Sequence, residues 1–265
     1  MKNKTNLYFL SIILFAILLC ILRTACMLTS YNTDVGYFEN NVLVVLTQIL
    51  SIIGVAWCIA LSVILSKSAE TVNINSQPHK IVSFFAGFIF LISGIAIILG
   101  SWKLFPLNIP RSSTLFTLLF GIFTLLSSLF FFTKHAKRPR AAHTACGFWV
   151  LIFLFCVLFH IYFDMYVAIN SPLKIALQLS ILSAMIFILF EIRKGLGMTI
   201  PRFSMAAQCL CVIFCLPTAV SHLIFGISSQ SSWLTKNITS PLFSLPLLAL
   251  GIFAALTPLF CKNEK

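Results

Sequence analysis

Charge is scarce in this chain, and acidic charge is the scarcest. Among 265 residues only six are aspartate or glutamate, and charged residues of both signs make up 9%. Soluble globular domains hold about 25% charged residues, so the composition excludes an ordinary soluble domain. Hydrophobic residues instead make up 60% of the chain, and the mean hydropathy is +1.04. This composition predicts a polytopic membrane protein.

Familiar catalytic motifs are also absent. The sequence has no G-x-x-x-x-G-K-[ST], no H-E-x-x-H, no G-x-S-x-G and no paired-acid motif. Nucleotide hydrolysis and the common metal or serine chemistries therefore have no visible site. The tightest group among nine cysteines, Cys209, Cys211 and Cys215, has no histidine or acid at ligand spacing. We expect no metal and no cofactor, and we expect that the chain is not an enzyme.

Several apolar runs reach the roughly 20 residues that a helix needs to cross a bilayer. Helices are expected because lipid offers no hydrogen-bond partner to backbone N–H and C=O groups. The fold class predicted is an all-α bundle of about eight transmembrane helices. The expected spans are 7–28, 42–66, 81–104, 112–133, 144–166, 172–190, 205–227 and 241–261.

Basic residues indicate the orientation of the bundle. If the N-terminus is cytoplasmic, thirteen of the 18 lysines and arginines lie on the inside and five on the outside. The positive-inside rule then predicts that both termini are cytoplasmic and that the first apolar run is a retained helix. We expect a multi-pass protein of the cell membrane, with lipid and another membrane subunit or a second copy as partners. The net charge of +12 needs no nucleic acid to explain it.

Two stretches of the sequence match at an offset of 130 residues. The segments "DVGYFENNVLVVLTQ" (34–48) and "DMYVAINSPLKIALQ" (164–178) share aspartate, asparagine, leucine and glutamine in register. At the same offset "GIFTLLSSLF" (121–130) matches "GIFAALTPLF" (251–260), whereas the third and seventh spans align poorly. The pattern predicts a duplication of residues 1–133 as 134–265. Because each half would hold four spans, the two repeats would be parallel.

The only two aspartates occupy matching positions in this repeat, at the predicted outer surface. One interpretation is a solvated acid that pairs with Lys174 or Arg23. The other is a polar vestibule that receives a cation or a polar solute, with His160 one helical turn before Asp164. The candidate ligand residues are Asp34, Asp164, His160, Gln48, Gln178 and His222.

Polar amides near the same surface have simpler interpretations. Asn40 and Asn170 precede two spans and are expected to cap them, and Ser171 before Pro172 is typical of a helix start. The paired glutamines lie about 12 Å deeper, where the two interpretations are an interhelical hydrogen bond and a ligand contact. Glu191, beside two basic residues, is expected at the cytoplasmic surface.

Three functions remain open from the sequence. The first is a small transporter or solute-binding membrane protein that uses the interface between the halves, and it predicts a polar cavity there. The second is a non-catalytic partner or assembly subunit of a larger membrane complex, which predicts a dry, well-packed centre. The third is an intramembrane lipid-modifying enzyme, which would need His160 and Asp164 beside a nucleophile or metal.

Overall fold

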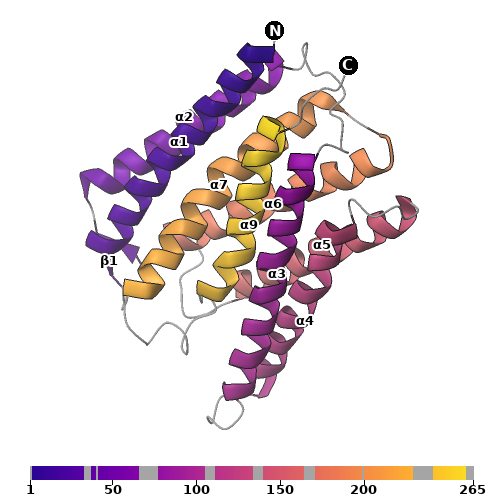
Figure 1. Ribbon diagram of the computed structural model, residues 1–265. Helices are drawn as coiled ribbons and strands as arrows, with labels where there is room; N and C mark the ends of the chain where they lie inside the picture. Colours follow the sequence, from indigo (N-terminus) through magenta and orange to yellow (C-terminus); the bar gives the residue numbers. More distant parts are fainter. Residues whose placement is uncertain are drawn as a thin grey trace.

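The computed structural model describes residues 2–32, 37–39, 41–65, 77–104, 111–133, 140–163, 171–198, 200–228 and 241–260. These residues form eight helices and one antiparallel hairpin of two short strands (Figure 1). The strands are β1 (Tyr31–Asn32) and β2 (Tyr37–Phe38). The helices are α1 (Lys2–Thr29), α2 (Val42–Leu65), α3 (Gln77–Leu104), α4 (Arg111–Thr133), α5 (Arg140–Phe163), α6 (Pro172–Gly195), α7 (Pro201–Ser228) and α9 (Pro241–Phe260).

Every predicted span is a helix, so the predicted fold class is confirmed. Seven of the described helices are long and apolar enough to cross a membrane, and α9 adds a shorter apolar helix, Ser244–Pro258. Prolines inside α7 and α9 do not end these helices, because neighbouring helices can satisfy the freed carbonyl groups. The chain is a multi-pass membrane protein.

The ends of two helices test the predicted caps. Ser171 takes the extended backbone of a cap before α6, as expected, although its side chain makes no capping hydrogen bond. Before α2 the cap is Asn41, whose Oδ1 accepts a long hydrogen bond from the Leu43 N–H at 3.5 Å. Asn41 has this role because it directly precedes the first helical residue. The predicted caps Asn40 and Asn170 lie outside the described residues.

Helix α7 lies at the centre of the arrangement. It packs against α1, α2, α6 and α9, while α3 packs against α4 and α9, and α5 joins α4 to α6. Figure 1 shows α1 and α2 on one flank of α7, and α3 with α4 on the other. Helix α1 begins and α9 ends at the same end of the bundle. We call the opposite end, which carries β1 and β2, the hairpin end.

A cluster of buried aromatic side chains joins α3, α4, α5 and α9. The ring centroid of Phe90 on α3 lies 5.1 Å from that of Phe131 on α4 and 6.1 Å from that of Phe153 on α5. Phe131 in turn contacts Phe253 on α9, at 5.3 Å. All four side chains are buried. Aromatic packing therefore fills the interior where these four helices meet.

The two predicted halves share one local packing feature. A Cβ added at Gly121 would lie 2.5 Å from Ile98, so α4 packs closely on α3 at this glycine. A Cβ added at Gly251 would lie 2.8 Å from Leu216, so α9 packs on α7 in the same way. Other contacts differ, since α1 packs on α7 whereas α5 packs on α4 and α6. The duplication, its division into 1–133 and 134–265, and the cytoplasmic side remain predictions.

Candidate ligand-binding groove

A cavity of about 390 Å³ lies near the hairpin end, between α1, α2, α6 and α7. Its volume falls within the range of about 300–1,000 Å³ that is typical of ligand sites. Most of its lining is apolar, and it also holds one charged side chain, Arg23, and the amide of Gln48. We call this cavity the Arg23 groove. Its other lining residues include Leu19, Phe38, Thr47, Ser51, Ile52, Leu179, Ile213 and Thr218.

Arg23 lies within the membrane-spanning part of α1, Tyr8–Thr29. It precedes the end of α1 by six residues, which places it roughly 9 Å along the helix from the hairpin end. Its Nε is buried and has no hydrogen-bond acceptor in the part of the chain that the structure describes. The only ion pair among the described residues is elsewhere, between Lys194 and Glu191. A guanidinium stays charged in proteins, so Arg23 brings to an apolar site a charge that no acid among the described residues compensates.

The hydroxyl groups of the groove differ from Arg23, because the protein already satisfies them. Thr47 Oγ1 donates to the Leu43 carbonyl at 2.7 Å and lies 3.2 Å from Cys26 Sγ. Thr218 Oγ1 accepts a hydrogen bond from Ser180 Oγ at 2.8 Å. Among the described groove residues, the groups left without a hydrogen-bond partner are therefore the Arg23 Nε and the Gln48 amide and not the hydroxyl groups.

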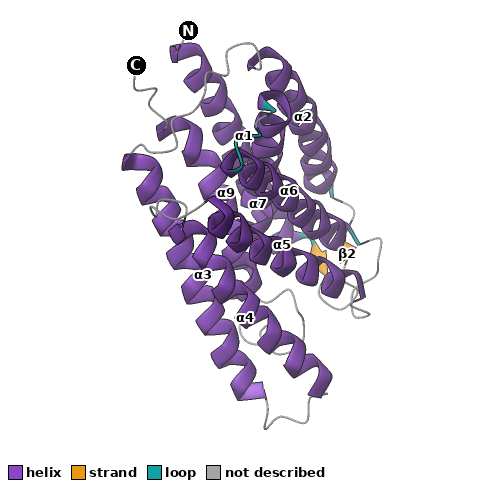
Figure 2. Ribbon diagram, turned by 90° about the vertical axis from the view of Figure 1, so that its right-hand side faces the viewer, coloured by secondary structure: helices purple, strands orange, loops and turns teal. Residues whose placement is uncertain are grey.

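Aromatic side chains cover the groove at the hairpin end. Phe38 of β2 lines the groove, and its ring centroid lies 5.2 Å from that of Tyr31. Tyr31 makes an edge contact with Phe225 of α7 at 5.6 Å, and these rings pack on the buried side chains of Met27 and Leu173. Strand β2 also packs against α6, and Figure 2 shows the strands beside that helix. This aromatic cover ties the hairpin to α1, α6 and α7.

One of the candidate residues from the sequence lines this groove. It is Gln48 of α2, which lies there with Arg23 of α1 and Thr218 of α7. His222 is buried on α7 and is not part of the groove lining. The structure thus brings together side chains from α1, α2 and α7 that are far apart in the sequence.

The other candidate residues do not lie at the groove. His160 on α5 packs against Phe120 of α4, with ring centroids 5.1 Å apart. Gln178 is half-buried on α6 and is not part of the groove lining. Asp34 and Asp164 lie outside the described residues. The acidic vestibule therefore remains a prediction.

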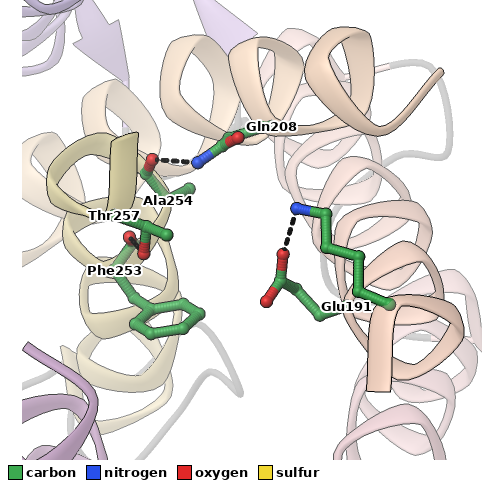
Figure 3. A network of polar contacts seen from close by, with 6 residues as sticks. Glu191, Gln208, Phe253, Ala254 and Thr257 are labelled. Atoms are coloured by element: carbon green, nitrogen blue, oxygen red, sulfur yellow. Dashed lines mark hydrogen bonds and ion pairs between the residues drawn. The ribbon is translucent and has the colours of Figure 1, made fainter. Parts of the chain in front are cut away.

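The interhelical amide hydrogen bond is made by a glutamine that the sequence analysis did not select. Gln208 Nε2 on α7 donates to the Ala254 carbonyl of α9 at 2.9 Å, and the amide is buried (Figure 3). Within the described residues neither Gln48 nor Gln178 makes a hydrogen bond through its side chain. Gln208 has no counterpart in the predicted repeat, so the repeat directed attention away from it. The available signal was an amide inside a long apolar run.

Glu191 is a buried acid near the end of the bundle opposite the hairpin end. Its side chain is 4% exposed. Lys194 Nζ, one helical turn later, donates to Glu191 Oε1 at 2.6 Å. Figure 3 shows the carboxylate on the side of α6 that faces α7 and α9. The lysine thus neutralises this acid within the helix, and the expected place of Glu191 at the cytoplasmic surface of the membrane remains a prediction.

The cysteine group is part of the core. Cys215 Sγ donates to the Ser180 carbonyl at 3.3 Å and lies 3.7 Å from Cys211 Sγ. Cys209 is fully buried nearby on the same helix. No cluster of three or more histidine, cysteine or acidic side chains suited to a metal occurs among the residues that the structure describes. These thiols act there as small packing groups.

Comparisons of the chain with protein-family models, with curated proteins and with solved structures give no match. Function must therefore be inferred from the chemistry of the Arg23 groove.

Proposed function

We propose that this multi-pass membrane protein is a small transporter or solute-binding membrane protein whose ligand carries a negative charge and binds in the Arg23 groove. One observation carries the proposal. A cation inside a spanning helix faces a ligand-sized cavity, and no acid among the described residues pairs with it. Ionisable groups inside membranes are costly and are commonly retained for function.

The chemistry of the guanidinium favours a carboxylate or a phosphate. Its planar N–H groups can form two parallel hydrogen bonds to either anion, and such charge-assisted bonds are among the strongest in proteins. Gln48 lines the same cavity and adds an amide that can donate to a ligand oxygen. An anion would thus supply the counter-charge that the described groove lacks.

The position of the groove agrees with the transporter interpretation of the sequence. It lies between α1 and α2 of the predicted first half and α6 and α7 of the predicted second half. The sequence favoured a cation or polar solute because it weighted the two aspartates. The described part of the groove instead has a basic side chain, so we propose an anion.

A second candidate is a non-catalytic subunit of a membrane complex. The tightly packed aromatic cluster around Phe90 and Phe131 favours this candidate, which predicts a well-packed interior. In that case an acidic group of a partner protein would pair with Arg23, and the isolated protein would bind no small anion.

Binding by the isolated protein distinguishes the two. We expect carboxylates or phosphates, but not amines, to raise the unfolding temperature of the protein in nanodiscs of zwitterionic lipid. A ligand at a hundred times its Kd should add about 2.7 kcal/mol of stability. Arg23→Gln should abolish the shift, whereas Lys80→Gln, which removes an exposed cation from α3, should preserve it. Equal shifts in both variants would reject the proposal.

A further inference from the structure

We infer that the ligand of the Arg23 groove is a single-chain amphiphile with one acidic head group, and that it enters from the lipid phase between α2 and α6. This inference rests on the proposed anion binding and names the substrate class. It follows from the polarity along the groove, from the exposure of its rim, and from the aromatic cover at the hairpin end.

Polarity changes along the groove. Arg23 and Gln48 lie near the hairpin end, roughly 9 Å along their helices. The deepest lining residue on α7 is Ile213, which is 15 residues before the end of that helix, or roughly 22 Å along it. Leu19 and Ile52 line the stretch in between. A ligand that fills this space would carry charge at one end and a hydrocarbon chain at the other.

The rim of the groove is exposed along its side. Ile52 of α2 is 70% exposed, and Leu179 of α6 is 42% exposed. Leu19 and Ile213, which form the floor, are buried. The rim residues lie inside membrane-spanning segments, so the surface on which they open is hydrocarbon. The hydrocarbon chain of a ligand in the surrounding lipid can therefore reach the floor of the groove from the side.

Aromatic rings lie at the hairpin end of the groove. Phe38 lines the groove there and packs on Tyr31, which packs on Phe225. These rings favour entry of the ligand from the side, through the exposed rim, over entry from this end.

The volume of the groove limits the ligand to a single hydrocarbon chain. A cavity of about 390 Å³ is near the lower end of the range for small-molecule sites. It has space for a head group and a single chain, whereas a phospholipid would have to leave its second chain in the bilayer.

Equilibrium binding in nanodiscs tests the inference, with empty nanodiscs to subtract partition into lipid. The probes are dodecanoate, butyrate, inorganic phosphate and dodecylamine. Each methylene that leaves water strengthens binding about fourfold, so dodecanoate should bind at least about 100-fold more tightly than butyrate. Dodecylamine should show no saturable binding, and Arg23→Gln should remove that of dodecanoate.

A matched pair of variants tests whether the hydrocarbon chain of the ligand lies in the groove. Ser51→Phe fills the groove wall on α2, and we expect it to weaken dodecanoate binding at least about tenfold. Ile49→Phe adds the same bulk on the exposed surface of α2, away from the groove, and should leave binding unchanged. If Ser51→Phe does not fold, Leu179→Phe on the opposite wall replaces it.

The outcomes separate the inference from the proposed function. In one outcome butyrate or phosphate binds as tightly as dodecanoate or more tightly, with binding that depends on Arg23. That result would overturn the inference of an amphiphilic ligand but would still support an anion site at Arg23. Arg23-dependent dodecanoate binding that Ser51→Phe and Leu179→Phe do not weaken would also overturn the inference. Absence of Arg23-dependent binding for all three anions would reject both.

Discussion

Glu191 and Arg23 lie inside spanning segments near opposite ends of the bundle. Glu191 is buried and has Lys194 within 2.6 Å, on the same helix. Arg23 lines a cavity and has no acidic partner among the described residues. A buried charge with its own counter-charge can stabilise a helix bundle, whereas one without a counter-charge costs stability. The difference teaches that Glu191 has a structural role, and it supports the proposal that Arg23 binds an acidic ligand.

The largest expected effect concerns which side of the membrane each end faces. If the charge bias is interpreted correctly, the Glu191 end is cytoplasmic and the Arg23 end is outside. Reporter fusions after residues 70, 138, 196 and 265 should therefore give a cytoplasmic signal, and fusions near 36, 108, 169 and 233 an outside signal. The signal is all-or-none at each position. One reversal inside the series would reject the eight-span topology.

Breaking the pair at the Glu191 end should give the next largest effect. Glu191→Gln leaves Lys194 without its acid and should lower the free energy of unfolding by about 2 kcal/mol. This is less than for a fully buried pair, because the Lys194 side chain is 24% exposed. The measurement is chemical unfolding in detergent. In the double variant with Lys194→Gln the loss should be smaller than the sum of the single losses, and simple additivity would exclude a coupled pair.

Removing the charge at the Arg23 end should raise the free energy of unfolding, whereas breaking the Glu191 pair lowers it. Arg23→Leu removes a charge that the described protein does not compensate, so the ligand-free protein should gain about 1–2 kcal/mol in unfolding free energy. The same variant should lose anion binding. Unfolding in ligand-free detergent measures the gain. A loss of stability would mean that Arg23 already has a partner within the chain.

The smallest effect is expected at a neutral polar contact. Gln208→Leu removes the hydrogen bond from α7 to the Ala254 carbonyl of α9, which should cost about 0.6–1.7 kcal/mol. Gln178→Leu serves as the control, because Gln178 makes no hydrogen bond among the described residues. Equal losses in the two variants would contradict the assignment of the interhelical hydrogen bond to Gln208.

The sequence predicted the helices because hydropathy and backbone hydrogen bonding act locally. The predicted span ends differ from the helix ends by up to five residues, as at the start of α1 and at the end of α6, which continues to Gly195. The last turns of α6 hold Glu191 and Lys194, whose pairing depends on side chains and not on hydropathy. The fold class thus followed from composition, while the exact helix ends did not.

The site was harder to predict, because it depends on which helices become neighbours. Gln48 was selected for its place in the repeat, and His222 as a further member of the predicted polar vestibule. Arg23 was considered only as a possible partner for an aspartate. Nothing in the sequence shows that α1 and α2 pack on α7 with α6 beside them, and that arrangement creates the cavity. A basic residue inside the first apolar run was the signal available.

The central claim is that Arg23 provides the counter-charge for an acidic ligand inside the membrane. Solid-state NMR can measure the distance between the ¹⁵N-labelled guanidinium and the ¹³C-labelled carboxyl carbon of dodecanoate bound in nanodiscs. A bidentate ion pair predicts a nitrogen-to-carbon distance of about 4 Å, with a signal that disappears in Arg23→Gln. The account would be contradicted if no contact with the ligand appeared and the guanidinium instead contacted a carboxylate of the protein, such as that of Asp34.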